Sequence, residues 1–146
     1  MRCTPLSVIK NRIYILTIVD RETRCVLSWD IIGKRTQENM QACLDQALGA
    51  KRYYSDAFPI YGKLYYGAPF ELLKNKSETY SVEAVNADMR HYMKRLARRS
   101  RCFSRQVQAL KKNMQLFVHC YNRRQIMKRR FPKYSFHLID FLCPVV

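Results

Sequence analysis

Two apolar segments connected by a short polar one make up the stretch Arg12-Ile-Tyr-Ile-Leu-Thr-Ile-Val-Asp-Arg-Glu-Thr-Arg-Cys-Val-Leu-Ser-Trp-Asp-Ile-Ile32. Residues 12–19 are rich in β-branched and aromatic side chains, which is typical of a buried central strand. Asp20-Arg-Glu-Thr-Arg24 has the composition of a hairpin turn, and residues 25–32 supply a second strand before Gly33. The sequence therefore predicts a β-hairpin whose first strand ends at an aspartate.

A helix and a short strand are predicted after this hairpin. Thr36 is a suitable N-cap, and residues 37–48 carry apolar side chains at helical spacing before Gly49. Residues 51–55 have the composition of a short strand that runs directly into Asp56. Two predicted strands thus end in carboxylates.

The second half of the chain predicts two amphipathic helices. They follow a loop-like region, residues 57–79, in which residues 70–73 favour a brief strand. One narrow stripe of 3.6-residue period predicts a helix with a single buried face: Val82, Val85, Met89, Met93 and Leu96. A second helix is predicted from the candidate N-cap Ser104, with these residues inward: Val107, Leu110, Met114, Phe117, Val118 and Tyr121. Residues from 127 onward are basic and then apolar, and the pattern assigns them no structure.

The charge of the chain points to a polyanionic partner. Its 146 residues, enough for one domain, include 27 Lys and Arg against 11 Asp and Glu, a net charge of +16. No acidic residue lies between Asp88 and Asp140, whereas residues 90–130 hold 14 of the basic ones. A field of one sign favours phosphate backbones over a small acidic substrate.

The cysteines exclude two common kinds of site. The six of them lie far apart without a C-x-x-C pair, which argues against zinc ligation and a disulfide framework. The N-terminus lacks an apolar signal segment, and the longest apolar run, residues 13–19, is too short to span a bilayer. These features predict reduced, packed thiols in a cytoplasmic protein without a membrane partner.

The carboxylates after the two strands suggest metal chemistry. On a helix, Glu83, Asn86, Arg90 and Lys94 form a row beside the apolar stripe, so that Glu83 lies at the edge of the core. If Glu83 converges with Asp20 and Asp56, a hard divalent cation removes their mutual repulsion. Oxygen-only ligands suit Mg²⁺ or Mn²⁺, and two such ions support in-line phosphodiester displacement. The alternatives are a turn-forming or ion-paired aspartate and an ordinary first-turn glutamate.

The same residues resemble the transposases of insertion sequence one, which are DDE enzymes of bacterial mobile elements. The family's signature consists of a catalytic glutamate, an Asn, an Arg and a basic run. This signature is similar to Glu83-x-x-Asn86-x-x-x-Arg90, followed by Lys94-Arg-Leu-Ala-Arg-Arg-Ser-Arg-Cys-Phe-Ser-Arg105. Asp20-Arg-Glu-Thr-Arg24 resembles its first acidic motif, and Tyr54-Ser-Asp56 with Tyr61 its second. The similarity spans roughly residues 12–126.

The resemblance implies an α/β fold, a ribonuclease-H-like mixed sheet flanked by helices, over residues 1–126, with residues 127–146 as a C-terminal tail. It implies that Asp20, Asp56 and Glu83 are the catalytic, metal-binding triad; Asp30 and Asp88 match no motif position. The implied activity is DNA cleavage by activated water, followed by attack of the freed 3′-hydroxyl on target DNA. The family's N-terminal zinc-binding and helix-turn-helix region has no counterpart before the first predicted strand, so we expect a second-frame product or a truncated copy.

The DNA partner is expected to be double-stranded, from element ends and target, and a homo-oligomer is an open alternative. The residues expected to contact DNA are Asn86, Arg90, Lys94, Arg95, Arg98, Arg99, Arg101 and Arg105. The aromatic residues that are candidates for stacking on splayed bases, with core packing as the alternative, are Trp29, Tyr53, Tyr54, Tyr61, Tyr65 and Tyr66. Two other functions stay open: an inactive DNA-binding remnant, and a ribonuclease-H-like nuclease or resolvase outside transposition.

Overall fold

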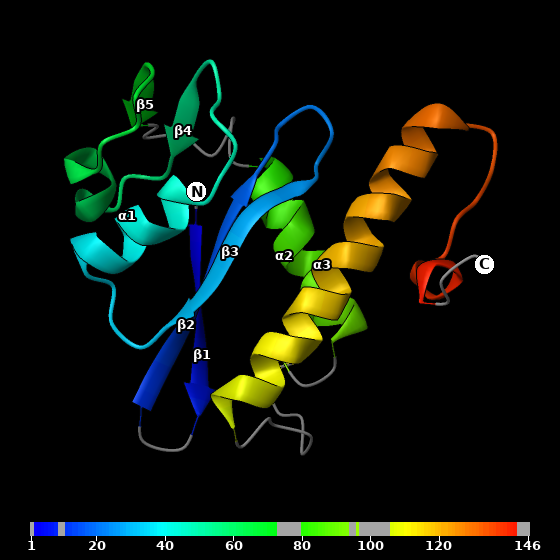
Figure 1. Ribbon diagram of the computed structural model, residues 1–146, viewed down its shortest axis with the longest axis horizontal. Helices are drawn as coiled ribbons and strands as arrows, with labels where there is room; N and C mark the ends of the chain where they lie inside the picture. The colour runs from blue at the N-terminus through cyan, green and yellow to red at the C-terminus, as the bar shows by residue number, and fades with distance from the viewer. Residues whose placement is uncertain (1, 9–10, 73–79, 94–95, 97–105, 143–146) are drawn as a thin grey trace.

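The larger sheet contains three antiparallel strands (Figure 1). The computed structural model describes residues 2–8, 11–72, 80–93, 96 and 106–142, with side chains from residue 13 onward. The strands are β1 (Arg2–Val8), β2 (Asn11–Val19) and β3 (Val26–Ile32), in the order β1-β2-β3. β2 and β3 confirm the predicted hairpin, with Leu16 opposite Asp30.

β1 was not among the elements predicted from the sequence. It pairs with β2 from Val8 opposite Asn11 to Arg2 opposite Thr17. Pro5 lies in the middle of this strand and cannot donate to the ladder, so the segment lacks a strand signal. At the edge of a sheet a proline is tolerated, and the edge is where β1 lies.

The predicted helices are present, with differences at their ends. α1 (Gln37–Asp45) begins after Thr36, whose side chain accepts the N–H of Asn39, as predicted. It ends before the expected Leu48, which is 76% exposed and not in the core. α2 (Tyr80–Tyr92) buries three residues of the predicted stripe, and α3 (Val107–Arg130) begins after Gln106 with a mostly buried predicted face. Val107 itself is exposed, because the first turn of α3 lies beyond the core.

Alternation along β2 divides the core into two clusters on opposite faces of the sheet (Figure 1). Ile13 and Ile15 face α2 and α3, where they pack with Val85, Met89 and Met114 among others. On the opposite face, Leu16 and Ile18 pack against α1 through Met40, Cys43 and Leu44 and against Tyr61 and Leu64. The end of β2 therefore lies where both layers meet.

A second, smaller sheet lies beyond α1. β4 (Tyr53–Ser55) pairs in parallel with β5 (Phe70–Leu72), and the 3-10 helix η1 (Pro59–Lys63) connects them. β2 has β1 on one edge and β3 on the other, and β4 pairs with a strand from later in the chain. The strands described here thus form two sheets, and the single mixed sheet of a ribonuclease-H-like fold stays a prediction.

The region that the sequence left open continues α3 and folds back on it. α3 runs to Arg130, and a 3-10 helix, η4 (Leu138–Phe141), returns along it with Leu138 buried in the core. The Arg124 Nε–H donates to the carbonyl of Phe136 at 2.8 Å. Residues 131–142 therefore close the core. Of the thiols that can be described, Cys25, Cys43 and Cys120 form no disulfide, and the last two are buried, as predicted.

Candidate functional site

The turn after β2 is closed by Asp20 itself. Its N–H donates to the carbonyl of Cys25 at 2.9 Å, and its carbonyl accepts the N–H of Arg24 at 2.9 Å. Its Oδ2 accepts the backbone N–H of Thr23 at 3.0 Å and a short hydrogen bond from the Thr23 hydroxyl. Its Oδ1 lies 3.5 Å from the N atom of Glu22. The carboxylate is therefore held in one orientation, and its turn-forming role, one of the two alternatives, is present.

The environment of Asp20 favours the ionised carboxylate. Partial burial raises its pKa, but the hydrogen bonds from the Thr23 side chain, the Thr23 N–H and the Glu22 N–H lower it, as does the charge of Arg129. The lowering effects are larger in sum, so the pKa of Asp20 lies below its usual value. A carboxylate that stays charged is the form a cation requires.

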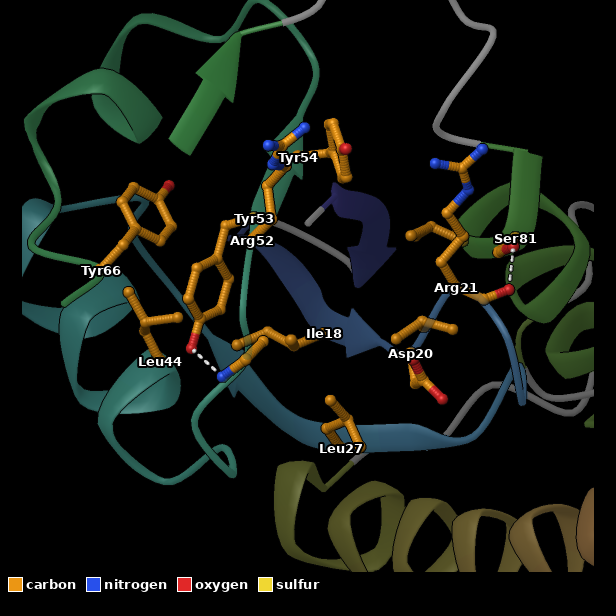
Figure 2. A pocket seen from close by; sticks show the side chains of 13 residues that line it. Ile18, Asp20, Arg21, Leu27, Leu44, Arg52, Tyr53, Tyr54, Tyr66 and Ser81 are labelled. Atoms are coloured by element: carbon orange, nitrogen blue, oxygen red, sulfur yellow. Dashed lines mark hydrogen bonds between the residues drawn. The ribbon is translucent and has the colours of Figure 1, made fainter. Parts of the chain in front are cut away.

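A pocket of about 120 Å³ opens between this turn, β4 and the start of α2 (Figure 2). We call it the tyrosine pocket, because Tyr53, Tyr54 and Tyr66 line it. Figure 2 shows Tyr53 and Tyr66 on one side, with Asp20 and Ser81 on the other. The pocket thus adjoins the three elements from which the predicted acids come: the end of β2, the strand β4 and the first turn of α2.

A bulge and a hydrogen bond shape this pocket. The β2–β3 register shifts between Ile18 and Val19, which leaves Leu27 as an extra residue on β3. Leu27 and Ser28 consequently both face α1, where the Ser28 hydroxyl donates to the carbonyl of Cys43 at 2.8 Å, and Leu27 lines the pocket. The hydroxyl of Ser81 donates to the carbonyl of Arg21 at 3.2 Å and ties α2 to the turn.

The other two predicted acids lie close in the chain to residues that line the pocket. Asp56 directly follows β4, and Glu83 is in the first turn of α2, next to Val82; both side chains are partly buried. No three Asp, Glu, His or Cys side chains among the residues described are grouped closely enough to hold a metal ion. The structure therefore places the three acids on neighbouring elements without forming a closed metal centre. The rival Asp30 is ion-paired, its Oδ1 being 3.1 Å from the Nζ of Lys111.

The donor chemistry at these positions suits a hard cation. Each of the three acids offers carboxylate oxygens, and one turn after Glu83 the Oδ1 of Asn86 is buried and accepts no hydrogen bond from the described part of the chain. Oxygen donors of this kind are those that Mg²⁺ and Mn²⁺ take. The residues fit such an ion by type, but in the described part of the chain they do not lie close enough together to enclose it.

The predicted DNA contacts divide into two groups. Asn86 is 4% exposed, and Arg90 is exposed in the last turn of α2. Burial argues against a direct phosphate contact by Asn86 in this arrangement, because its side chain lies inside the fold. The remaining predicted contacts lie outside the described residues: Lys94, Arg95, Arg98, Arg99, Arg101 and Arg105.

A cationic group near Asp20 was missed by the sequence analysis. Asn122 ties α3 to β3, donating from Nδ2 to the Val26 carbonyl and accepting its N–H, both at 2.8 Å. Further along α3, the charges of Arg124 and Arg24 act on Lys128. Burial and then Arg124 lower the pKa of Lys128, against the raising effect of Asp88. Together with Arg129, whose charge lowers the pKa of Asp20, these residues make the α3 cation group: Arg24, Arg124, Lys128 and Arg129.

The comparisons with known proteins agree with this picture. A family model described as IS1 transposase matches residues 8–124, a stretch that includes Asp20, Asp56 and Glu83. No curated protein and no solved structure matches the chain. In the part of the chain that can be described, every helix is too short or too polar to cross a membrane. The match covers most of the chain and confirms the resemblance, so the protein belongs to the IS1 transposase family, whose partner is DNA.

Proposed function

We propose that this chain carries the catalytic centre of the transposase, which cuts DNA strands with the help of divalent metal ions and transfers the freed ends. One observation carries the proposal: the ends of β2 and β4 and the start of α2 meet around a single pocket, and each supplies one acid. Those acids are Asp20, Asp56 and Glu83. The family match supports the transposase role, and the placement supports these residues as its centre.

The three carboxylates would hold two Mg²⁺ or Mn²⁺ ions. The Oδ1 of Asn86 would be a further oxygen donor. When bound, such ions activate an attacking oxygen and stabilise the leaving oxygen of an in-line displacement. Asp20 is prepared for this role, because Thr23 orients its carboxylate and keeps it ionised. In this proposal, DNA binding brings Asp56 and Glu83 close to Asp20 and so completes the metal centre.

The positive charge around the pocket supports DNA as the ligand of this edge. Arg21 and Arg52 line the pocket, and the charge of Arg129 contributes to the lowered pKa of Asp20. Positive charges near a carboxylate allow a phosphate backbone to approach an acidic centre that would otherwise repel it. The same proposal includes a ribonuclease-H-like arrangement, in which one mixed sheet carries both aspartates.

The test is a strand-nicking and strand-transfer assay on element-end DNA, with Mg²⁺ or without it. We expect Mg²⁺-dependent products from the parent chain and background levels from Asp20→Asn, Asp56→Asn and Glu83→Gln. Asp30→Asn is the matched control, because this acid is ion-paired with Lys111 outside the pocket. Activity that survives all three substitutions would remove these residues from the centre.

A second candidate is a non-catalytic DNA-binding protein of the same family. The observation that favours it is that no cluster of three metal-binding side chains is formed within the described ranges. A parent chain that binds element-end DNA, folds normally and yields no product with Mg²⁺ or Mn²⁺ would select this alternative. A nuclease outside transposition would instead cut DNA without joining the ends to a target.

A further inference from the structure

The tyrosine pocket has a use that the acids alone do not explain. Its volume of about 120 Å³ is roughly ten times the minimum that holds one water molecule. Its walls are mainly apolar, with Leu27 and Leu44 beside the tyrosines, and two arginines, Arg21 and Arg52, among the lining residues. A flat ring attached to an anionic group suits such a site better than a chain of water molecules does.

The rings of the pocket are held in place before any ligand arrives. Tyr66 stacks on Phe70 with centroids 4.1 Å apart, and its hydroxyl donates to the carbonyl of Tyr61 at 2.9 Å. The hydroxyl of Tyr53 accepts the N–H of Ala50 at 3.1 Å. Fixed rings lose little freedom when a ligand stacks on them, which favours binding.

Cationic side chains lie at the pocket beside the ring site. The guanidinium of Arg21 lies 5.7 Å from the centroid of the Tyr54 ring, and Arg52 is paired with Glu71 at 3.4 Å. Asp20 lines the same pocket as the tyrosines, so a strand that passes Asp20 also passes the ring site.

We propose that the tyrosine pocket binds one unstacked nucleobase of the DNA strand whose backbone passes Asp20. This inference relies on the proposed function to identify the DNA strand that is bound. Stacking on tyrosine faces is open to every base, so the site selects an unstacked base and not a particular sequence. Of the other aromatic candidates, Tyr61 is buried in the core, Trp29 packs against the opposite core cluster, and Tyr65 points to solvent outside the pocket.

The test compares three DNA probes by fluorescence anisotropy with the full chain and no divalent cation. The probes are a matched duplex, the same duplex with one bulged thymine, and the same duplex with an abasic residue at the bulge. Because stacking one base on an aromatic ring strengthens binding appreciably, we expect the bulged thymine to bind about tenfold tighter than the abasic bulge. Equal affinity for those two probes would overturn the proposal.

Matched variants locate the effect. Tyr54→Leu is expected to abolish the preference, Tyr54→Phe to keep it because the ring remains, and Tyr65→Leu to keep it because Tyr65 is 80% exposed and outside the pocket. Thermal unfolding checks that each variant folds. A preference that persists in Tyr54→Leu is then measured in Tyr66→Leu, and its persistence there as well would overturn the site.

A second measurement keeps the base site distinct from the cleavage proposal. A bulged 4-thiothymine should crosslink on irradiation to residues that line the pocket, and a crosslink confined to residues outside the pocket would contradict the assignment. Glu83→Gln should lose cleavage and keep the thymine preference, since Glu83 does not line the pocket. A parent chain that prefers the bulged thymine and does not cut DNA would sink the cleavage proposal alone, whereas cutting without preference would sink the base site alone.

Discussion

The two faces of the three-stranded sheet are covered in different ways. On one face, the long helix α3 and α2 pack on Ile13 and Ile15, and η4 closes the layer. On the other face, the short helix α1 and the β4–β5 sheet pack on Leu16 and Ile18. We call these the α3 layer and the α1 layer.

The difference separates the predicted acids. Asp20 leaves β2 at the junction of the layers, Glu83 comes from α2 in the α3 layer, and Asp56 follows β4 in the α1 layer. Asp20 is fixed by several hydrogen bonds, whereas Asp56 follows a strand of only three residues. A catalytic centre built from residues of both layers depends on how firmly the layers pack against each other. Experiments can test the strength of this packing.

The largest expected effect tests whether the layers unfold together. Met114 in the α3 layer and Met40 in the α1 layer are both fully buried. Replacing either with Ala should lower the free energy of unfolding by about 2–5 kcal/mol. Because adjacent residues of β2 serve both layers, we expect one shared transition in chemical denaturation monitored by circular dichroism.

The control for this pair is Leu48→Ala, which should leave stability nearly unchanged because Leu48 is 76% exposed. Two separate transitions, with Met40→Ala shifting only one, would show that the layers are independent units. The two layers would then be separate domains.

A smaller effect is expected at the tie between α3 and the hairpin. Asn122 makes two hydrogen bonds of 2.8 Å to the backbone of Val26. Asn122→Ala leaves both backbone groups without this partner, at a cost of roughly 1–3 kcal/mol in the free energy of unfolding. Gln115→Ala, on the exposed side of the same helix, is the control. Equal stability of the two variants would show that Asn122 does not fasten the α3 layer.

The α3 cation group predicts that the layers differ in their contact with DNA. Arg129→Gln should weaken DNA binding and reduce the slope of log affinity against log salt by about one, since one phosphate contact is lost. Lys63→Gln, an exposed cation of the α1 layer, should leave the slope unchanged. Titrations at several salt concentrations measure both slopes, and a change for Lys63 alone would move the DNA to the other face.

Much of the fold could be predicted from local pattern. The β2–β3 hairpin follows from two runs rich in β-branched and aromatic residues on either side of a polar turn, and the buried stripes of α2 and α3 follow from a period of 3.6 that the sequence keeps over many residues. β1 was missed because Pro5 obscures a strand that is tolerated at a sheet edge. The partner of β4 was not predictable either, since three residues carry no information on which strand they pair with.

The candidate site residues could be named from the sequence, but their geometry could not. The positions of Asp20 and Asp56 after strands can be read from the sequence, but the bulge at Leu27 and the pocket depend on tertiary pairing. The contribution of Lys128 and Arg129 was missed because the apolar period fades in that part of α3, and only packing shows which cations approach the hairpin.

The smallest expected effect concerns how Thr23 holds Asp20 at the junction of the layers. The pKa of Asp20 lies below its usual value of 3.8, so its ionised form stabilises the fold above that pH, and the contribution is lost as the pH falls through the lowered pKa. Thr23→Val removes the hydroxyl donor and should raise the pKa of Asp20 toward the usual value. It should also reduce the loss of stability on acidification below about pH 4.

Carboxyl chemical shifts followed by NMR during a pH titration would measure this change, and Thr23→Ser should restore the lowered pKa because it keeps the donor. The shift in stability is expected to be small, since Asp20 is only partly buried and solvent screens its charge. If Thr23→Val left the pKa of Asp20 unchanged, the backbone N–H groups of Thr23 and Glu22 and the charge of Arg129, rather than the Thr23 hydroxyl, would keep this carboxylate ionised. The junction would then owe its prepared anion to the turn backbone and α3 together, and the side chain of Thr23 would contribute nothing to it.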